Sequence, residues 1–318
     1  MTLSVAVFGA GAVGSYYGAR LAEGGADVTL IARGRHLDAL RRDGLTVVEP
    51  ERTTTHHLDA TQDPADIGEV DVVLFTVKSY DTDEAAARLR PLLRDDTAVI
   101  SLQNGIDNED RIATIVGREH VVGGAAYILG AVREPGVVDA AGPRSIVIGE
   151  LAGGPPTDRL EAIRRTGANA GLEVGLAEDI RVALWEKYTL LVAFSAMTGT
   201  TRLPIGAIRE APAARAMLEA IMTEVWSVGR ATGVPLADDL VDRQMALLTS
   251  QDAEATTSLY RDLVAGHRTE LEALQGAAMR IGREHRVPTP HIDAVYAIIQ
   301  PWALRNEVRA DDRLPIPT

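Results

Sequence analysis

The feature that most constrains the fold of this chain is a glycine-rich turn near its N-terminus. The mostly apolar run Leu3–Phe8 leads directly into Gly9, Gly11 and Gly14, spaced as G-x-G-x-x-G, and an amphipathic stretch begins at Ala12. Between a strand and a helix, the first glycine permits a tight turn and the second lets a pyrophosphate approach the backbone, while the third lets helix and strand pack closely. The N-terminus of that helix offers free N–H groups to phosphates. The motif therefore predicts a dinucleotide-binding domain, with a plain strand-to-helix turn as the alternative.

The first half of the chain alternates short β-branched runs with amphipathic stretches, a pattern typical of a parallel sheet with crossover helices. The expected strands are Leu3–Phe8, Asp27–Ala32, Asp71–Val77, Thr97–Leu102 and Val121–Gly123. The expected helices are Ala12–Glu23, Asp83–Leu93 and Asn108–Ile115. Shorter β-like runs separated by Pro-Gly and Gly-Pro predict antiparallel strands at the sheet edge, at Tyr127–Val132, Gly136–Asp139 and Arg144–Gly149.

The second half lacks these short β-branched runs and shows long helical patterns instead. They cover Asp179–Met197, Pro212–Thr232, Ala237–Thr249, Thr257–His285 and His291–Arg305. The predicted fold class is therefore α/β, with an N-terminal Rossmann-type doubly wound sheet followed by an all-α C-terminal domain. We expect a dinucleotide-binding domain over residues 1–177 and a helical substrate and catalytic domain over residues 178–318.

Composition narrows the class of partner. The chain has 318 residues with 32 Lys plus Arg against 45 Asp plus Glu, a net charge of −13, which disfavours binding to nucleic acid or to an anionic membrane. It has no cysteine, which fits a cytoplasmic protein, and its apolar N-terminal run is expected to be a strand rather than a signal peptide. Its seven histidines show no metal-ligand spacing, so we expect no metal.

Polar residues follow three of the predicted strands, at the sheet edge where open α/β folds bind ligands. Arg33 follows the second strand, where an enzyme that uses NAD carries an acidic residue, so we expect NADP(H) with a guanidinium on the 2′-phosphate. Lys78 and Asn104 follow two further strands and are candidate ligand contacts. The alternatives are solvated loop charges at Arg33 and Lys78, and an ordinary Asn-Gly turn at Asn104.

The helical half carries a lysine in uncharged surroundings. On a helix, Lys187 shares a face with Leu184, Leu191 and Ser195, and no charged residue follows it until Arg202. An ammonium group in a partly apolar wall can act as the general acid that hydride addition to a ketone requires, the alternative being a lysine that snorkels to solvent.

Further along the chain lie three more polar candidates. Ser258, Asp262 and Glu270 have spacings of four and eight that can align on one helical face, although Gly266 can bend the helix between them.

Taken together, these residues resemble the ketopantoate reductase family (2-dehydropantoate 2-reductases) along nearly the whole chain. The resemblance rests on the glycine motif and Arg33, on Val77-Lys78-Ser79-Tyr80, Gln103-Asn104-Gly105 and Trp185-Glu186-Lys187, and on Ser258, Asp262 and His267-Arg268-Thr269-Glu270. It implies NADPH-dependent reduction of a 2-oxo acid, with 2-dehydropantoate to pantoate as the leading reaction, a step of pantothenate biosynthesis.

The resemblance also implies roles for single residues. Lys187 is then the general acid, and Lys78 and Asn104 contact the cofactor or the substrate. Glu270 organises the cofactor ribose and the catalytic site, and Ser258 helps to bind the substrate carboxylate.

The chain departs from the family at two positions. Family members usually carry asparagines one and two turns after the catalytic lysine, where this chain has Leu191 and Ser195. Leu191 cannot hydrogen-bond a substrate hydroxyl, which leaves Ser195 as the polar candidate there and makes a related branched or larger 2-oxo acid the next substrate. An opine or polyol-phosphate dehydrogenase and a noncatalytic NADPH sensor are the alternatives, and the sequence leaves open whether the chain forms a homodimer.

Overall fold

The computed structural model describes residues 2–311, which divide into two compact units. Within the described residues, the first unit comprises 2–103 and 108–183, and the second comprises 104–107 and 184–311. The boundary thus lies inside a long helix at Ala183, a little beyond the expected position at residue 177. The four-residue loop Asn104–Asp107 belongs to the second unit although its neighbours in sequence belong to the first.

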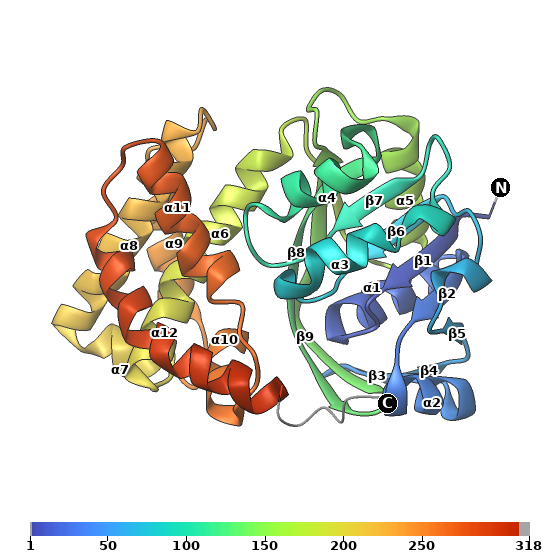
Figure 1. Cartoon of the computed structure of the whole chain (residues 1–318), viewed down its shortest axis with the longest axis horizontal. Coiled ribbons are helices and arrows are strands. Elements are labelled where there is room, and N and C mark those ends of the chain that lie inside the picture. Colours follow the sequence, from blue (N-terminus) through green and yellow to red (C-terminus); the bar gives the residue numbers. More distant parts are fainter. Residues whose placement is uncertain (1, 312–318) are drawn as a thin grey trace. The chain divides into compact units, whose positions relative to one another are not determined.

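The first unit is built around a ten-stranded mixed sheet with helices on both faces (Figure 1). Its strands are β1 (Ser4–Phe8), β2 (Asp27–Ile31), β3 (Leu45–Val48), β4 (Thr53–His56), β5 (Asp59–Thr61), β6 (Val72–Phe75), β7 (Ala98–Ser101), β8 (Val121–Glu134), β9 (Val137–Glu150) and β10 (Val174–Leu176). The order is β4-β3-β9-β8-β7-β6-β1-β2-β5, with β10 paired to β9. The strands β5, β2, β1, β6, β7 and β8 are paired in parallel. The predicted doubly wound sheet is confirmed.

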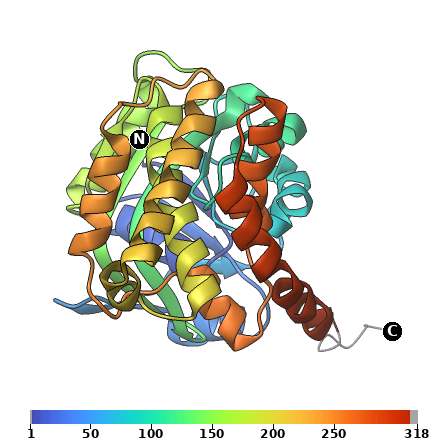
Figure 2. The ribbon, with the colours of Figure 1, turned by 90° about the vertical axis from the view of Figure 1, so that its left-hand side faces the viewer.

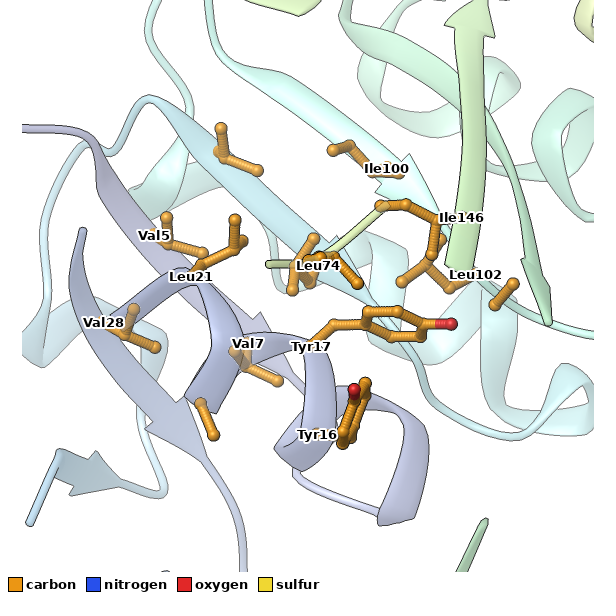
Figure 3. Close-up of a cluster of buried hydrophobic side chains, with 14 of the residues drawn as sticks. Val5, Val7, Tyr16, Tyr17, Leu21, Val28, Leu74, Ile100, Leu102 and Ile146 are labelled. Atoms are coloured by element: carbon orange, nitrogen blue, oxygen red, sulfur yellow. The ribbon is translucent and has the colours of Figure 1, made fainter. Parts of the chain in front are cut away.

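The central strands are apolar on both sides because helices cover both faces. The helices of this unit are α1 (Ala12–Glu23), α2 (Gly34–Asp43), α3 (Thr82–Ala87), α4 (Asn108–Val116) and α5 (Asp158–Asn169). Side chains of α1, α2 and α5 pack with one set of alternating strand residues, and those of α3 and α4 pack with the other. Figure 3 shows Tyr17 and Leu21 of α1 among Leu74, Ile100 and Ile146 of the sheet.

The region predicted as several short edge strands is one long hairpin. β8 and β9 each run for 14 residues, so Val121–Gly123 and Tyr127–Val132 belong to the same strand. Near its start, β8 approaches β7 too closely for a side chain, because a Cβ on Gly124 would lie 2.6 Å from the Ser101 carbonyl oxygen. β8 therefore serves both as the parallel neighbour of β7 and as the antiparallel partner of β9.

The second unit is a bundle of helices, drawn from yellow-green to red in Figure 2. They are α6 (Ile180–Thr201, which begins in the first unit), α7 (Ile205–Glu210), α8 (Pro212–Ala231), α9 (Leu240–Ser250), α10 (Ser258–Ala265), α11 (Ala277–Glu284) and α12 (Pro290–Asp311). The predicted helical C-terminal domain is confirmed as a fold class. None of the helices in the described part of the chain is long and apolar enough to span a membrane.

The single helix expected over Thr257–His285 is wrong. α10 ends at Ala265, and the next residue, Gly266, adopts a left-handed conformation with φ of 72°, a common helix stop. An irregular segment then leads to a π-helical turn at Glu272–Gly276, and α11 continues from it. Ser258 and Asp262 lie on α10 whereas Glu270 lies beyond its end, so the three do not share one helical face.

Candidate functional site

The glycine motif occupies the turn between β1 and α1. Gly9 has φ of 101°, and a Cβ there would lie 2.9 Å from the backbone nitrogen of Val77. A Cβ on Gly14 would lie 2.3 Å from the Thr76 hydroxyl oxygen. Around Gly11, by contrast, no atom lies within 4 Å of the Cβ position, and Gly11 is the N-cap of α1. Packing inside the unit explains Gly9 and Gly14, while Gly11 leaves open space beside the free N–H groups of the helix.

Three turns at the carboxyl edge of the parallel strands are hydrogen-bonded to each other. The Thr76 hydroxyl, after β6, donates to the Gly9 carbonyl at 2.6 Å. The side-chain amide of Gln103, after β7, donates to the Val77 carbonyl at 3.0 Å and to the Thr82 hydroxyl at 2.9 Å. The half-buried Lys78 directly follows Val77 in this connected edge. The structure therefore brings Lys78 and the glycine turn to the same edge of the first unit.

Arg33 lies at the end of β2, where it is the N-cap of α2. Its side chain is 78% exposed, and one guanidinium nitrogen lies 3.8 Å from a carboxylate oxygen of Asp81, an exposed pair of little strength. A guanidinium held this weakly can turn toward an incoming anion. Arg33 is therefore placed at the strand end where dinucleotide folds bind the adenosine ribose.

His36 on α2 connects this helix to the β8–β9 hairpin. Its Nδ1 accepts a hydrogen bond from the Gly136 backbone N–H at 3.1 Å. Burial lowers the pKa of His36, so the ring is neutral near pH 7 and retains this acceptor. Helix α2, which Arg33 caps, is thus anchored at its first turn.

In the second unit, Lys187 lies on α6 and is half-buried. Leu191, one turn further, is also half-buried, whereas Ser195 is only 1% exposed. The Ser195 hydroxyl donates to the Val192 carbonyl at 3.2 Å and accepts from the Gln275 amide at 2.8 Å. Ser195 is thus hydrogen-bonded inside the bundle, and its role as a substrate contact stays a prediction.

The segment with Glu270 and the loop with Asn104 both lie in the same unit as Lys187. Glu270 is 7% exposed, just before the π-helical turn. Arg280 on α11 connects the two segments, because its guanidinium lies 2.8 Å from the Asp107 carboxylate and 3.5 Å from that of Glu272. The structure therefore assembles three of the predicted site segments within one unit.

Ser258 lies at the first position of α10, where it is half-buried. The preceding residue, Thr257, caps this helix by accepting a hydrogen bond from the Tyr260 backbone N–H at 3.3 Å. The Thr257 hydroxyl also lies 2.9 Å from that of Thr198 on α6. The start of α10 is thereby fixed to the helix that carries Lys187.

Several residues that build these segments were not predicted. They are Thr76, Gln275 and Arg280, none of which belongs to a recognisable motif. Lysine usage is a signal that sequence reasoning passed over: only two of the 32 cationic residues are lysines, and these are Lys78 and Lys187. Among the described residues there is no group of three or more His, Cys, Asp or Glu that could hold a metal ion.

Comparison with known proteins gives matches along both units. The family model described as ketopantoate reductase PanE/ApbA matches residues 5–153, and the model of the C-terminal part of the same family matches residues 179–303. The 2-dehydropantoate 2-reductase of Halobacterium salinarum is 34% identical over 301 residues, which cover 94% of this chain and 98% of that protein.

Solved structures give the same result. A PanE/ApbA family ketopantoate reductase from Ralstonia eutropha has a TM-score of 0.88 and 32% identity, covering 96% of this chain and 100% of that one. A 2-dehydropantoate 2-reductase from Geobacter metallireducens has a TM-score of 0.89 and 29% identity, covering 94% and 99%.

Proposed function

Because this chain belongs to the ketopantoate reductase family, we propose that it reduces 2-dehydropantoate to pantoate with NADPH, using Lys187 as the general acid. Members of this family are NAD(P)-dependent oxidoreductases, and the chain is accordingly an oxidoreductase. The observation that carries the proposal is the family match along both units, which contain the glycine turn and the helical lysine respectively. A cytoplasmic location and a homodimer stay predictions.

The residues of the first unit fit a nicotinamide dinucleotide. Gly11 leaves room for a pyrophosphate beside the N-terminus of α1, and Lys78 lies at the same sheet edge. Arg33 favours NADPH, because its exposed guanidinium can form a charge-assisted pair with the 2′-phosphate that NADH lacks. The bound cofactor supplies a hydride to the keto carbon of the substrate.

The second unit contributes the residue that donates the proton. As the keto carbon gains the hydride, negative charge develops on its oxygen, and the Lys187 ammonium donates a proton there to give the hydroxyl. The lysine is left as a neutral amine, which regains a proton before the next turnover. Glu270 positions the lysine or the cofactor ribose, and Asn104 and Ser258 contact the ligands.

A second candidate substrate is a 2-oxo acid with an apolar side chain. Leu191 presents only carbon atoms one turn after Lys187, and the Ser195 hydroxyl is already bonded to Gln275. A substrate hydroxyl left unpaired beside Leu191 would cost about 1 to 3 kcal/mol of binding. This side of the site therefore suits an apolar group.

The test is NADPH consumption across a panel of 2-oxo acids that includes 2-dehydropantoate, combined with substitution of Lys187. We expect Lys187→Ala and Lys187→Arg to lower kcat by about 10² to 10⁴-fold, because arginine keeps the charge but does not release its proton. NADPH affinity should be nearly unchanged. Arg181→Ala is the matched control, because Arg181 lies on the same helix and pairs with Asp179 at the surface.

If Lys187→Arg is about as active as the wild type, Lys187 is not the proton donor. If the chain binds NADPH but oxidises it with none of the 2-oxo acids in the panel, that result would instead favour the cofactor-sensing alternative.

A further inference from the structure

The segment that carries Glu270 is held to helix α6 by two buried side chains that the proposed reaction does not use. The Tyr188 hydroxyl donates to the Leu274 carbonyl. The Gln275 amide donates to the Val192 carbonyl at 2.9 Å and to the Ser195 hydroxyl at 2.8 Å. Tyr188 is 1% exposed and Gln275 is fully buried. Helix α6, which carries Lys187, is thus joined at two points to the π-helical turn after Glu270.

Tyr188 also explains why this turn is irregular. In a regular α-helix the Leu274 carbonyl would accept from the N–H four residues later, which is that of Ala278. The Tyr188 hydroxyl donates to that carbonyl instead. A side chain inserted into the helical ladder in this way disrupts the regular pattern. Burial raises the pKa of Tyr188 well above its usual range, so the hydroxyl keeps its proton for the donated bond.

The π-helical turn determines the direction in which the chain leaves toward Glu270. The Gly276 N–H donates to the Leu271 carbonyl at 3.0 Å, five residues back, and the Leu274 N–H donates to the Glu270 carbonyl at 3.1 Å. A helix without the extra residue would rotate everything before it by about 100° about its axis. Glu270 would then occupy a different position relative to α6.

On the basis of the proposed function, we propose that Tyr188 and Gln275 are positioning residues that fix the π-helical turn and thereby place Glu270 for its work with Lys187. Both side chains bond to backbone or to interior groups, and neither is needed to touch substrate. Their effect on the reaction passes through Glu270. A purely structural role would instead lower stability without a specific dependence on Glu270.

A double-mutant cycle separates these two roles. Tyr188→Phe removes one hydroxyl and should lower kcat by about tenfold in the wild type, since small misplacements of catalytic groups have effects of this order. In a Glu270→Gln background the same substitution should change kcat by less than about twofold, because coupled residues are not additive. Gln275→Leu should behave in the same way.

The matched control is Tyr17→Phe in the first unit. Tyr17 is also buried, and its hydroxyl also donates to a backbone carbonyl, that of Ser145 at 2.8 Å. Tyr17→Phe should lower the melting temperature about as much as Tyr188→Phe does, while kcat stays within about twofold of the wild type. Amide hydrogen exchange over residues 270–278 should be faster in Tyr188→Phe and unchanged in Tyr17→Phe.

The inference is overturned if Tyr188→Phe lowers kcat by the same factor in both backgrounds, or if its only effect is the loss of stability seen with Tyr17→Phe. Failure of the proposed function has a different signature, in which Lys187→Arg and Glu270→Gln both retain wild-type kcat. The hydrogen-exchange measurement tests the placement of the π-helical turn without any activity.

Discussion

At the scale of single residues, lysine and arginine are used differently in this chain. Its 32 cationic residues include 30 arginines, and the two lysines are both candidate site residues. Arginine forms structural ion pairs, as in the pair of Arg280 with Asp107. Arginine forms bidentate pairs but stays protonated, whereas a lysine amine can lose and regain a proton. This usage supports proton donation by Lys187 independently of any motif.

Arg33 provides a test of cofactor preference. NADPH should bind more tightly than NADH in the wild type, because the 2′-phosphate gains a charge-assisted contact of about 1.5 to 3 kcal/mol. Arg33→Ala should lose that difference while its affinity for NADH stays nearly the same. Titration of both cofactors by nicotinamide fluorescence measures all four affinities. Equal affinities for the two cofactors in the wild type would contradict the assignment.

Leu191 provides a test of substrate preference. If the substrate side chain is apolar, the wild type should have a higher kcat/KM for an apolar 2-oxo acid than for 2-dehydropantoate. Leu191→Asn should then shift the preference toward 2-dehydropantoate by about 1 to 2 kcal/mol, because it offers a partner to the substrate hydroxyl. Steady-state kinetics with both substrates decide the matter. If the wild type prefers 2-dehydropantoate and Leu191→Asn only lowers its activity, another residue must bind the substrate hydroxyl.

At the scale of elements, the β1–α1 turn separates glycines needed for packing from the glycine kept for a ligand. Gly14→Ala should destabilise the first unit by about 1 to 3 kcal/mol, because the new methyl group meets Thr76 at 2.3 Å. Gly11→Ala meets no atom and should lose at most about 1 kcal/mol, as a poorer helix cap.

In cofactor binding the order of the two variants should be reversed, with Gly11→Ala the more strongly affected. Gly11→Ala narrows the approach of the pyrophosphate and should weaken NADPH binding by about tenfold, equivalent to about 1.4 kcal/mol. Thermal melts without cofactor and NADPH titrations measure the two effects separately. Wild-type affinity in a folded Gly11→Ala variant would show that the pyrophosphate binds elsewhere.

Elements with a strong period and clear ends were predictable, and irregular ones were not. β1, α1 and β2 follow directly from the glycine motif and the apolar runs around it. The strand β4 reads Thr-Thr-Thr-His and lies at the sheet edge with alternate residues exposed, so no apolar alternation marks it. Helix α2 and strands β3 and β5 in the same region were also missed.

The interruption after α10 had a different cause. Gly266 signalled a bend, but the π-helical turn depends on Tyr188, which lies 86 residues away from Leu274 in the sequence. Tertiary contacts of this kind leave no local pattern. The site residues nearest to regular elements, such as Gly9 and Arg33, lie at the strand ends where the sequence placed them, whereas the way Glu270 is held could not be predicted.

At the scale of the whole molecule, carboxylates whose pKa is lowered by folding make stability depend on pH. Burial alone raises the pKa of Asp71, but two hydrogen bonds from Ser4 and the Arg94 guanidinium outweigh it, so the pKa is lowered overall. The pKa of Glu150 is lowered in the same way by Arg159 and Thr157 against the effect of burial. A carboxylate whose pKa is lower in the folded state binds protons more readily when unfolded. The stability it contributes is therefore present above its unfolded pKa, about 4, and is lost as the pH falls through its folded pKa.

We accordingly expect the melting temperature to fall steadily as the pH is lowered from about 5 to 2, where carboxylates take up protons. Asp71→Asn should lower the stability by about 1 to 3 kcal/mol at pH 7, because charge-assisted hydrogen bonds across β1 and β6 are lost. The difference from the wild type should shrink as the pH approaches the folded pKa of Asp71, since protonation removes the same charge. Asp43→Asn is the control: Asp43 pairs with Arg42 at the exposed surface, where solvent screens the pair, so this variant should keep nearly the wild-type pH dependence. Melting curves recorded across this pH range would contradict the assignment if Asp71→Asn stayed equally destabilised at every pH, because its effect would then not come from the carboxylate charge.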